Sequence, residues 1–65
     1  MSHATYVAYV PKSKREKLRR TLMLEDTGEL KWREKRLRGG SEFYFTGPSA
    51  LARATHAYVC NWAVS

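Results

Sequence analysis

Apolar side chains alternate with polar ones over much of this chain, which is the pattern of strands that bury one face. Residues 4–10, ATYVAYV, are rich in Tyr and Val and are followed by a proline, so they predict a strand. Residues 41–47, SEFYFTG, predict another strand, with Phe43 and Phe45 on one face and Tyr44 on the other.

Residues 18–37 predict a β-hairpin. Gly28, in an Asp-Thr-Gly turn, suits the left-handed position of a three-residue loop. Pairing outward from this turn sets apolar residues opposite one another and adds an opposite-charge pair. The pairs are Leu24 with Leu30, Leu22 with Trp32, and Arg20 with Glu34. A helix would carry Gly28 in its interior, at about 1 kcal/mol relative to Ala. The hairpin is expected to follow a polar, basic loop at residues 11–17.

The last third of the chain changes to helical spacing. Pro48 fits the first turn of a helix, and apolar residues from Leu51 to Trp62 then share one helical face. The spacing predicts a helix over residues 48–62. Residues 57–64 also alternate with period two, so a strand there stays open as an alternative.

These segments predict one small basic domain, residues 1–65, with an α+β fold. We expect an antiparallel sheet of three to four strands with one C-terminal helix packed on one face. The helix would cover the face that carries the leucines and phenylalanines. The other face, with Lys31, Arg33 and Lys35, would then remain uncovered.

The chain is strongly basic. It has 12 Lys and Arg against 6 Asp and Glu, a formal net charge of +6, and eleven of the basic residues lie between Lys12 and Arg38. Such a balance favours an acidic partner, either nucleic acid or an acidic protein surface. The candidate binding residues are the basic side chains around the expected hairpin and one tyrosine that could stack on a base. They are Arg19, Arg20, Lys31, Arg33, Lys35, Arg36, Arg38 and Tyr44.

The expected order strand–strand–strand–helix, with a basic sheet, resembles two families of small DNA-binding domains. These are the domains of plant AP2 factors and the arm-binding domains of phage integrases. The resemblance covers residues 18–62. It would imply a sheet inserted into the major groove of DNA.

No catalytic site, metal site or cofactor is expected. Cys60 is the single cysteine, and His56 is the one soft ligand at helical spacing from it, whereas zinc sites need three or four ligands. Without a partner cysteine or a secretion signal, we expect a reducing cytoplasm. The longest apolar stretch is too short to cross a bilayer, so no membrane partner is expected. A homodimer would add buried area to the small core.

Two functions from different classes stay open. The first is a non-enzymatic binding protein that contacts DNA or RNA through the basic sheet face. The alternative is a small phage-type inhibitor or adaptor that blocks a host protein or a nucleic-acid-processing complex, as some anti-CRISPR proteins do. Tyr6, Tyr9 or Tyr44 would then be anchors, because tyrosine is common at interface hot spots.

Overall fold

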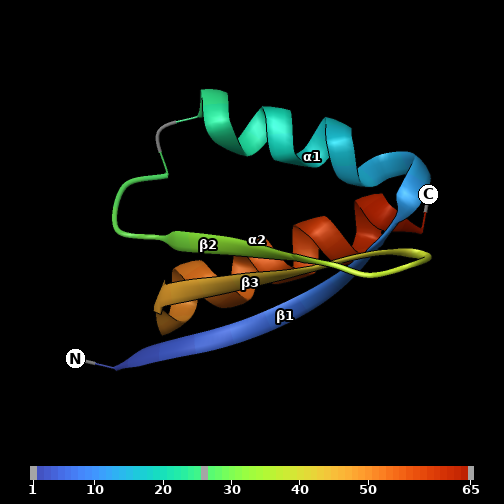
Figure 1. Ribbon diagram of the computed structural model, residues 1–65. Coiled ribbons are helices and arrows are strands. Elements are labelled where there is room, and N and C mark those ends of the chain that lie inside the picture. Colours follow the sequence, from blue (N-terminus) through green and yellow to red (C-terminus); the bar gives the residue numbers. More distant parts are fainter. Residues whose placement is uncertain (1, 26, 65) are drawn as a thin grey trace.

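The computed structural model describes residues 2–25 and 27–64. The elements in chain order are β1 (His3–Pro11), α1 (Lys12–Leu24), β2 (Lys31–Arg36), β3 (Gly40–Pro48) and α2 (Ser49–Ala63). The three strands form one antiparallel sheet in the order β1-β3-β2 (Figure 1). The predicted α+β fold, with a C-terminal helix packed on an antiparallel sheet, is therefore confirmed.

The structure has a helix, α1, that the sequence did not predict. It replaces the hairpin predicted over residues 18–37 and the loop predicted over residues 11–17, so both predictions are wrong. Lys, Arg, Glu, Leu and Met, which have high helix propensity, make up nearly all of α1. Leu18 and Leu22, four residues apart, lie on one helical face and are both buried. Leu24, which the hairpin would have paired with a leucine, is 82% exposed.

Gly28 does make a turn, but it joins a helix to a strand. Its φ is 61°, in the left-handed region that glycine enters without penalty. The chain then places Leu30, which is buried, directly before β2. The strand that pairs with β2 is β3. The segment that was expected to pair with β2 instead forms α1 and packs on the sheet as a helix.

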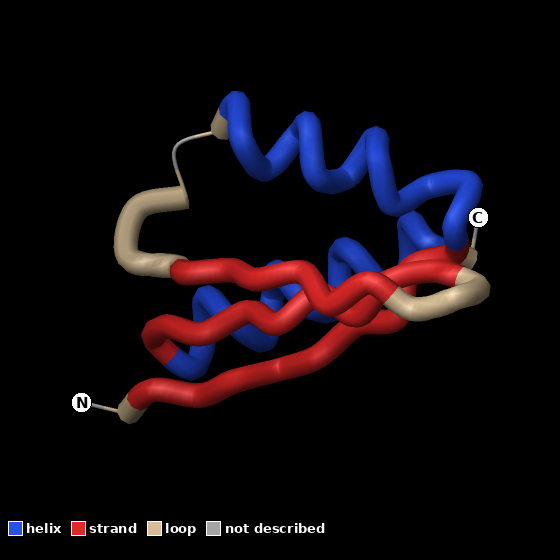
Figure 2. The backbone as a smooth tube through the Cα atoms, viewed as in Figure 1, coloured by secondary structure: helices blue, strands red, loops and turns tan. Residues whose placement is uncertain are grey.

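The two faces of the sheet differ in burial. Along β3, Phe43 and Phe45 are completely buried, whereas Glu42 and Tyr44, which alternate with them, are only partly buried. Successive side chains of a strand point to opposite faces, so the buried positions mark the face that the helices cover. The two helices therefore pack on the same face of the sheet, and within residues 2–25 and 27–64 neither helix covers the other face (Figure 2).

The core lies between the covered face and the helices. The ring of Trp32 lies 6.1 Å from that of Phe43, and Phe43 stacks at 6.5 Å on Phe45. From α2, Ala52, Val59 and Ala63 join these rings in the core. The helix continues to Ala63, so the strand alternative for the tail is wrong and the helix predicted over residues 48–62 is confirmed within one residue at each end.

One end of the sheet is closely packed around a glycine. Pro11, the last residue of β1, pairs with Gly40, the first residue of β3. A Cβ atom on Gly40 would overlap the carbonyl oxygen of Val10 and approach the hydroxyl of Tyr9 to 2.7 Å. Lys12 also donates its backbone N–H to the carbonyl of Gly39 at 3.1 Å, which fixes the start of α1 at the β2–β3 turn.

Candidate nucleic-acid interface

A row of three basic side chains runs along β2 on the uncovered face. Lys31, Arg33 and Lys35 pair with Thr46, Tyr44 and Glu42 of β3, and all three basic residues are exposed. Residues two apart on a strand are separated by about 6.6 Å, so the three charges span about 13 Å in a nearly straight line. We call these three residues the basic row.

Tyr44 lies beside the basic row on the central strand. Its hydroxyl donates a hydrogen bond to Glu42 Oε1 at 3.0 Å, and the guanidinium carbon of Arg33 lies 5.9 Å from the ring centroid. The hydrogen bond to the carboxylate, together with desolvation, raises the pKa of Tyr44 above its ordinary value. A shallow depression at this point is lined by Arg33, Glu34, Lys35 and Tyr44. Tyr44 is thus a ring held in place at both its edge and its face.

Two apolar side chains of β1 lie on the same uncovered face, on the other side of Tyr44 from the basic row. Val7 is 45% exposed and Tyr9 is 53% exposed, and they pair with Tyr44 and Glu42. The Tyr9 hydroxyl lies against Gly39 and Gly40, where a side chain on either residue would crowd it. The sequence could not assign a face to Tyr9, because both faces of β1 are apolar.

Tyr6, also considered as an anchor, lies on the covered face. Its ring packs 5.4 Å from that of His56 on α2. Of the three tyrosines considered as anchors, Tyr9 and Tyr44 therefore share the uncovered face and Tyr6 does not.

Half of the predicted binding residues share the uncovered face. These are Lys31, Arg33, Lys35 and Tyr44. Arg38 lies exposed in the β2–β3 turn and extends the basic surface beyond the row. Arg36, the last residue of β2, is exposed too, but it pairs with Ser41 and approaches Glu34 on the covered side. Arg19 and Arg20 are part of α1, so Arg20 does not take the cross-strand position opposite Glu34 that was expected in the hairpin. Arg19 instead binds Glu34 from the covered side.

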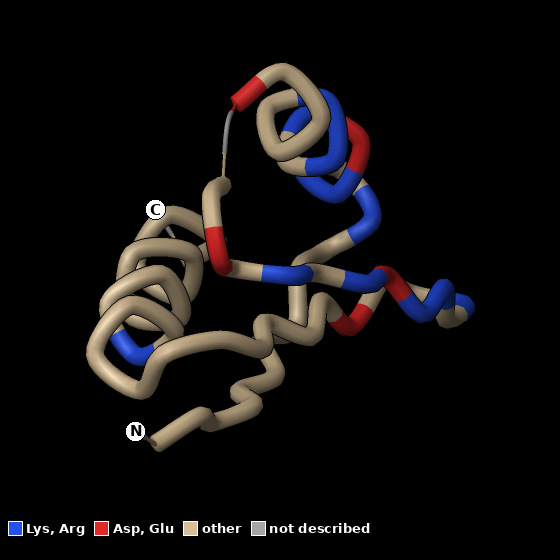
Figure 3. Tube along the Cα trace, turned by 90° about the vertical axis from the view of Figure 1, so that its left-hand side faces the viewer, with Lys and Arg blue, Asp and Glu red and all other residues tan. Residues whose placement is uncertain are grey.

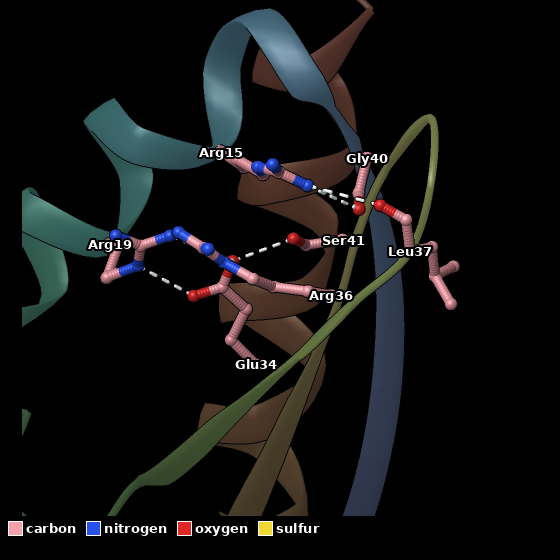
Figure 4. Close-up of polar contacts among 7 residues, drawn as sticks. All are labelled: Arg15, Arg19, Glu34, Arg36, Leu37, Gly40 and Ser41. Carbon is pink, nitrogen blue, oxygen red and sulfur yellow. Dashed lines mark hydrogen bonds and ion pairs between the residues drawn. The ribbon is translucent and has the colours of Figure 1, made fainter.

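Behind the uncovered face, Glu34 joins the sheet to α1 (Figure 4). Arg19 donates to its carboxylate at 2.7 Å and 3.2 Å, and the buried Ser41 donates at 2.7 Å. Hydrogen bonding from Arg19 is the main cause that lowers the pKa of Glu34, and desolvation opposes it. Arg36 approaches the same carboxylate at 3.9 Å. We call Arg19, Glu34 and Ser41 the Glu34 cluster.

A second set of contacts fixes the β2–β3 turn against α1. Arg15 donates through one nitrogen to the carbonyls of Gly40 at 2.9 Å and Leu37 at 3.3 Å. Figure 4 shows this guanidinium reaching across to the turn, close to the Glu34 cluster. The turn that carries Arg38 is therefore supported by α1.

Eleven of the twelve Lys and Arg residues lie in one half of the molecule. Figure 3 shows Lys and Arg along α1, β2 and the β2–β3 turn, whereas α2 carries only Arg53 and β1 carries none. A field concentrated in this way attracts polyanions to one side of the molecule.

His56 and Cys60 do lie together, but as neighbours on α2. Their side chains are 3.5 Å apart, and His56 Nε2 also lies 3.0 Å from the carbonyl oxygen of Val7. Among the described residues, no three His, Cys, Asp or Glu side chains gather closely enough to hold a metal ion. The His56 ring therefore ties α2 to the outer edge of β1.

Within residues 2–25 and 27–64, neither helix has the length and apolar character needed to cross a membrane. Comparison of the chain with protein-family models, with curated proteins and with solved structures finds no match.

Proposed function

We propose that this protein is a non-enzymatic nucleic-acid-binding protein and that the uncovered face of its sheet is the binding surface. The observation that carries the proposal is the basic row. Lys31, Arg33 and Lys35 project from a face that neither helix covers, and Glu42 is the one acidic residue among the strand positions of that face. Polyanion backbones are recognised by such sets of Lys and Arg side chains.

In the proposed mechanism, contacts with the phosphate backbone supply the binding affinity. The basic row neutralises backbone phosphates and releases their counterions, which gives affinity that falls as salt rises. Arg38 extends the contact beyond one end of β2. Three or four phosphate contacts would give a slope of log K against log salt of about −2 to −3 on a single strand. We propose a reducing cytoplasm as the setting, because Cys60 has no second cysteine to pair with.

The test is fluorescence anisotropy with labelled DNA and RNA over a salt series. The variant Arg33→Gln/Lys35→Gln removes two charges from the uncovered face without touching the core. We expect binding about 10- to 100-fold weaker near 50 mM salt and a slope reduced by about 1.4. Circular dichroism checks that the variant keeps the fold.

A matched control removes the same net charge elsewhere. Lys17→Gln/Arg53→Gln alters exposed residues of α1 and α2, away from the uncovered face. We expect this control to bind much like the original protein. Equal losses in both double variants would contradict the proposal, because binding would then follow net charge alone.

Failure of every nucleic-acid probe would favour a different partner. The same face, with Arg33 and two exposed or half-exposed tyrosines, also suits an acidic protein surface, since Arg and Tyr are enriched at interface hot spots. In that outcome the inhibitor or adaptor hypothesis would replace the nucleic-acid proposal.

A further inference from the structure

The uncovered face carries two different kinds of surface side by side. The basic row occupies β2 at one edge of the sheet, and Val7 and Tyr9 occupy β1 at the other. Tyr44 lies between them on β3. Neighbouring strands are about 4.8 Å apart, so charge and apolar surface are separated by about 10 Å. A complementary ligand has a line of anions next to flat apolar groups.

Tyr44 is held in position before any ligand arrives, and Tyr9 is accessible beside it. The hydroxyl of Tyr44 is fixed by Glu42, and the Arg33 guanidinium already lies over its ring. Tyr9 leans over two glycines at the end of the sheet and leaves half of its surface exposed. The Tyr44 ring therefore loses little conformational freedom when a base stacks on it.

The shape of the face does not suit the major groove of a duplex. Groove readers insert a helix or a two-stranded ribbon, and the resemblance to sheet-inserting families needs a strand over residues 18–24, which here belong to α1. Here both helices lie on the covered face. The β2–β3 ribbon does not project either, because Pro11 pairs with Gly40 and β1 accompanies β3 as far as the turn. A duplex also keeps the faces of its bases stacked inside, so Val7 and Tyr9 would gain no contact from it.

We infer that the uncovered face takes single-stranded nucleic acid, with bases stacked on Tyr9 and Tyr44 and phosphates along the basic row. This inference rests on the proposed function and adds the class of ligand to it. Stacking on aromatic rings is tolerant of sequence, since every base has a π-face. The ligand is therefore a single strand of DNA or RNA bound with weak sequence preference.

The experiment compares three labelled probes at one salt concentration: single-stranded DNA and RNA of about 12 nucleotides, a length within known site sizes, and the DNA duplex of equal length. We expect the single strands to bind more tightly than the duplex. Tyr44→Leu and Tyr9→Leu should each weaken single-strand binding by about 5- to 100-fold, with the salt slope unchanged. Tyr44→Phe keeps the ring and should bind within about threefold of the original protein.

Tyr58→Leu is the matched control, because Tyr58 is 72% exposed on α2, away from the uncovered face. Duplex binding equal to or tighter than single-strand binding would overturn the inference and leave the proposed function intact. The inference would also fail if Tyr9→Leu and Tyr44→Leu behaved like Tyr58→Leu. Absence of binding to all three probes would overturn both. The DNA and RNA arms show which sugar the face prefers.

Discussion

Arg19 in α1 donates two hydrogen bonds, of 2.7 Å and 3.2 Å, to the carboxylate of Glu34 in β2. The two residues are fifteen positions apart in the chain, and the Glu34 side chain is only 10% exposed. Because Ser41 of β3 donates to the same carboxylate, one acidic group connects α1 with two strands. Two kinds of contact therefore hold α1 on the sheet: the hydrogen bonds to Glu34, and the burial of Leu18 and Leu22 in the core.

Glu34→Gln should destabilise the fold more than Ser41→Ala. The first change removes a charged acceptor that serves three donors of Arg19 and Ser41, and we expect a loss of about 1.5–3 kcal/mol in the free energy of unfolding. The second removes one hydrogen bond and should cost about 1 kcal/mol. Urea denaturation measures both. Glu29→Gln, at an exposed loop position, should change stability by less than about 0.5 kcal/mol.

Stability should fall in acid partly through Glu34. Hydrogen bonding from Arg19 lowers the pKa of Glu34 in the folded chain below its ordinary value of 4.5. As pH falls, the unfolded chain therefore binds this proton first, which favours unfolding. The contribution is complete above about pH 4.5 and is lost as pH falls through the folded pKa.

The measurement is the urea midpoint of the original protein and of Glu34→Gln between neutral pH and about pH 3. The difference between the two should shrink as the solution becomes acidic. In an Arg19→Gln background the shrinkage should be smaller, since the main donor is gone. A difference that stays constant with pH would contradict the prediction.

Gly40→Ala should be far more damaging than Gly39→Ala. A Cβ atom at Gly40 overlaps the backbone carbonyl of Val10, which cannot move without breaking the β1–β3 pairing. At Gly39 the nearest atom is the Tyr9 hydroxyl at 3.2 Å, the end of a side chain that can shift. We expect a loss of more than about 2 kcal/mol for the first and less than about 1 kcal/mol for the second, measured by thermal or urea denaturation. Equal effects would count against the close approach at Gly40.

Phe45→Ala should leave the chain largely unfolded. Phe45 is completely buried, and such a truncation costs about 3–5 kcal/mol. Domains of this size have a total stability of only about 3–10 kcal/mol. Val7→Ala is the control. Val7 is 45% exposed on the uncovered face, so this variant should remain folded. Circular dichroism and one-dimensional NMR distinguish a folded variant from an unfolded one. A well-folded Phe45→Ala variant would contradict the prediction that Phe45 is essential to the core.

The strands and the last helix could be predicted because their signals are local. Alternation in SEFYFTG and in the segment after Leu30 identifies β3 and β2, and it also places Lys31, Arg33 and Tyr44 on one face. That shared face does not depend on which segment pairs with β2. For this reason the basic row was predicted correctly although its expected partner strand was not.

The segment of α1 could be read in two ways. The spacing of Leu22 and Leu24 fits a strand, whereas that of Leu18 and Leu22 fits a helix. What decides between them is tertiary structure. β3 occupies the place beside β2, and Glu34 offers an acceptor to Arg19 of the helix. The high helix propensity of the segment was the local signal that favoured the correct answer.

The one-sided distribution of charge has a consequence for motion in solution. With the basic residues gathered on α1, β2 and the β2–β3 turn, the centre of positive charge lies away from the centre of mass (Figure 3). Near a polyanion the molecule therefore experiences a torque as well as an attraction. Rotation would bring the basic half forward before contact, so a larger share of collisions would begin in a productive orientation.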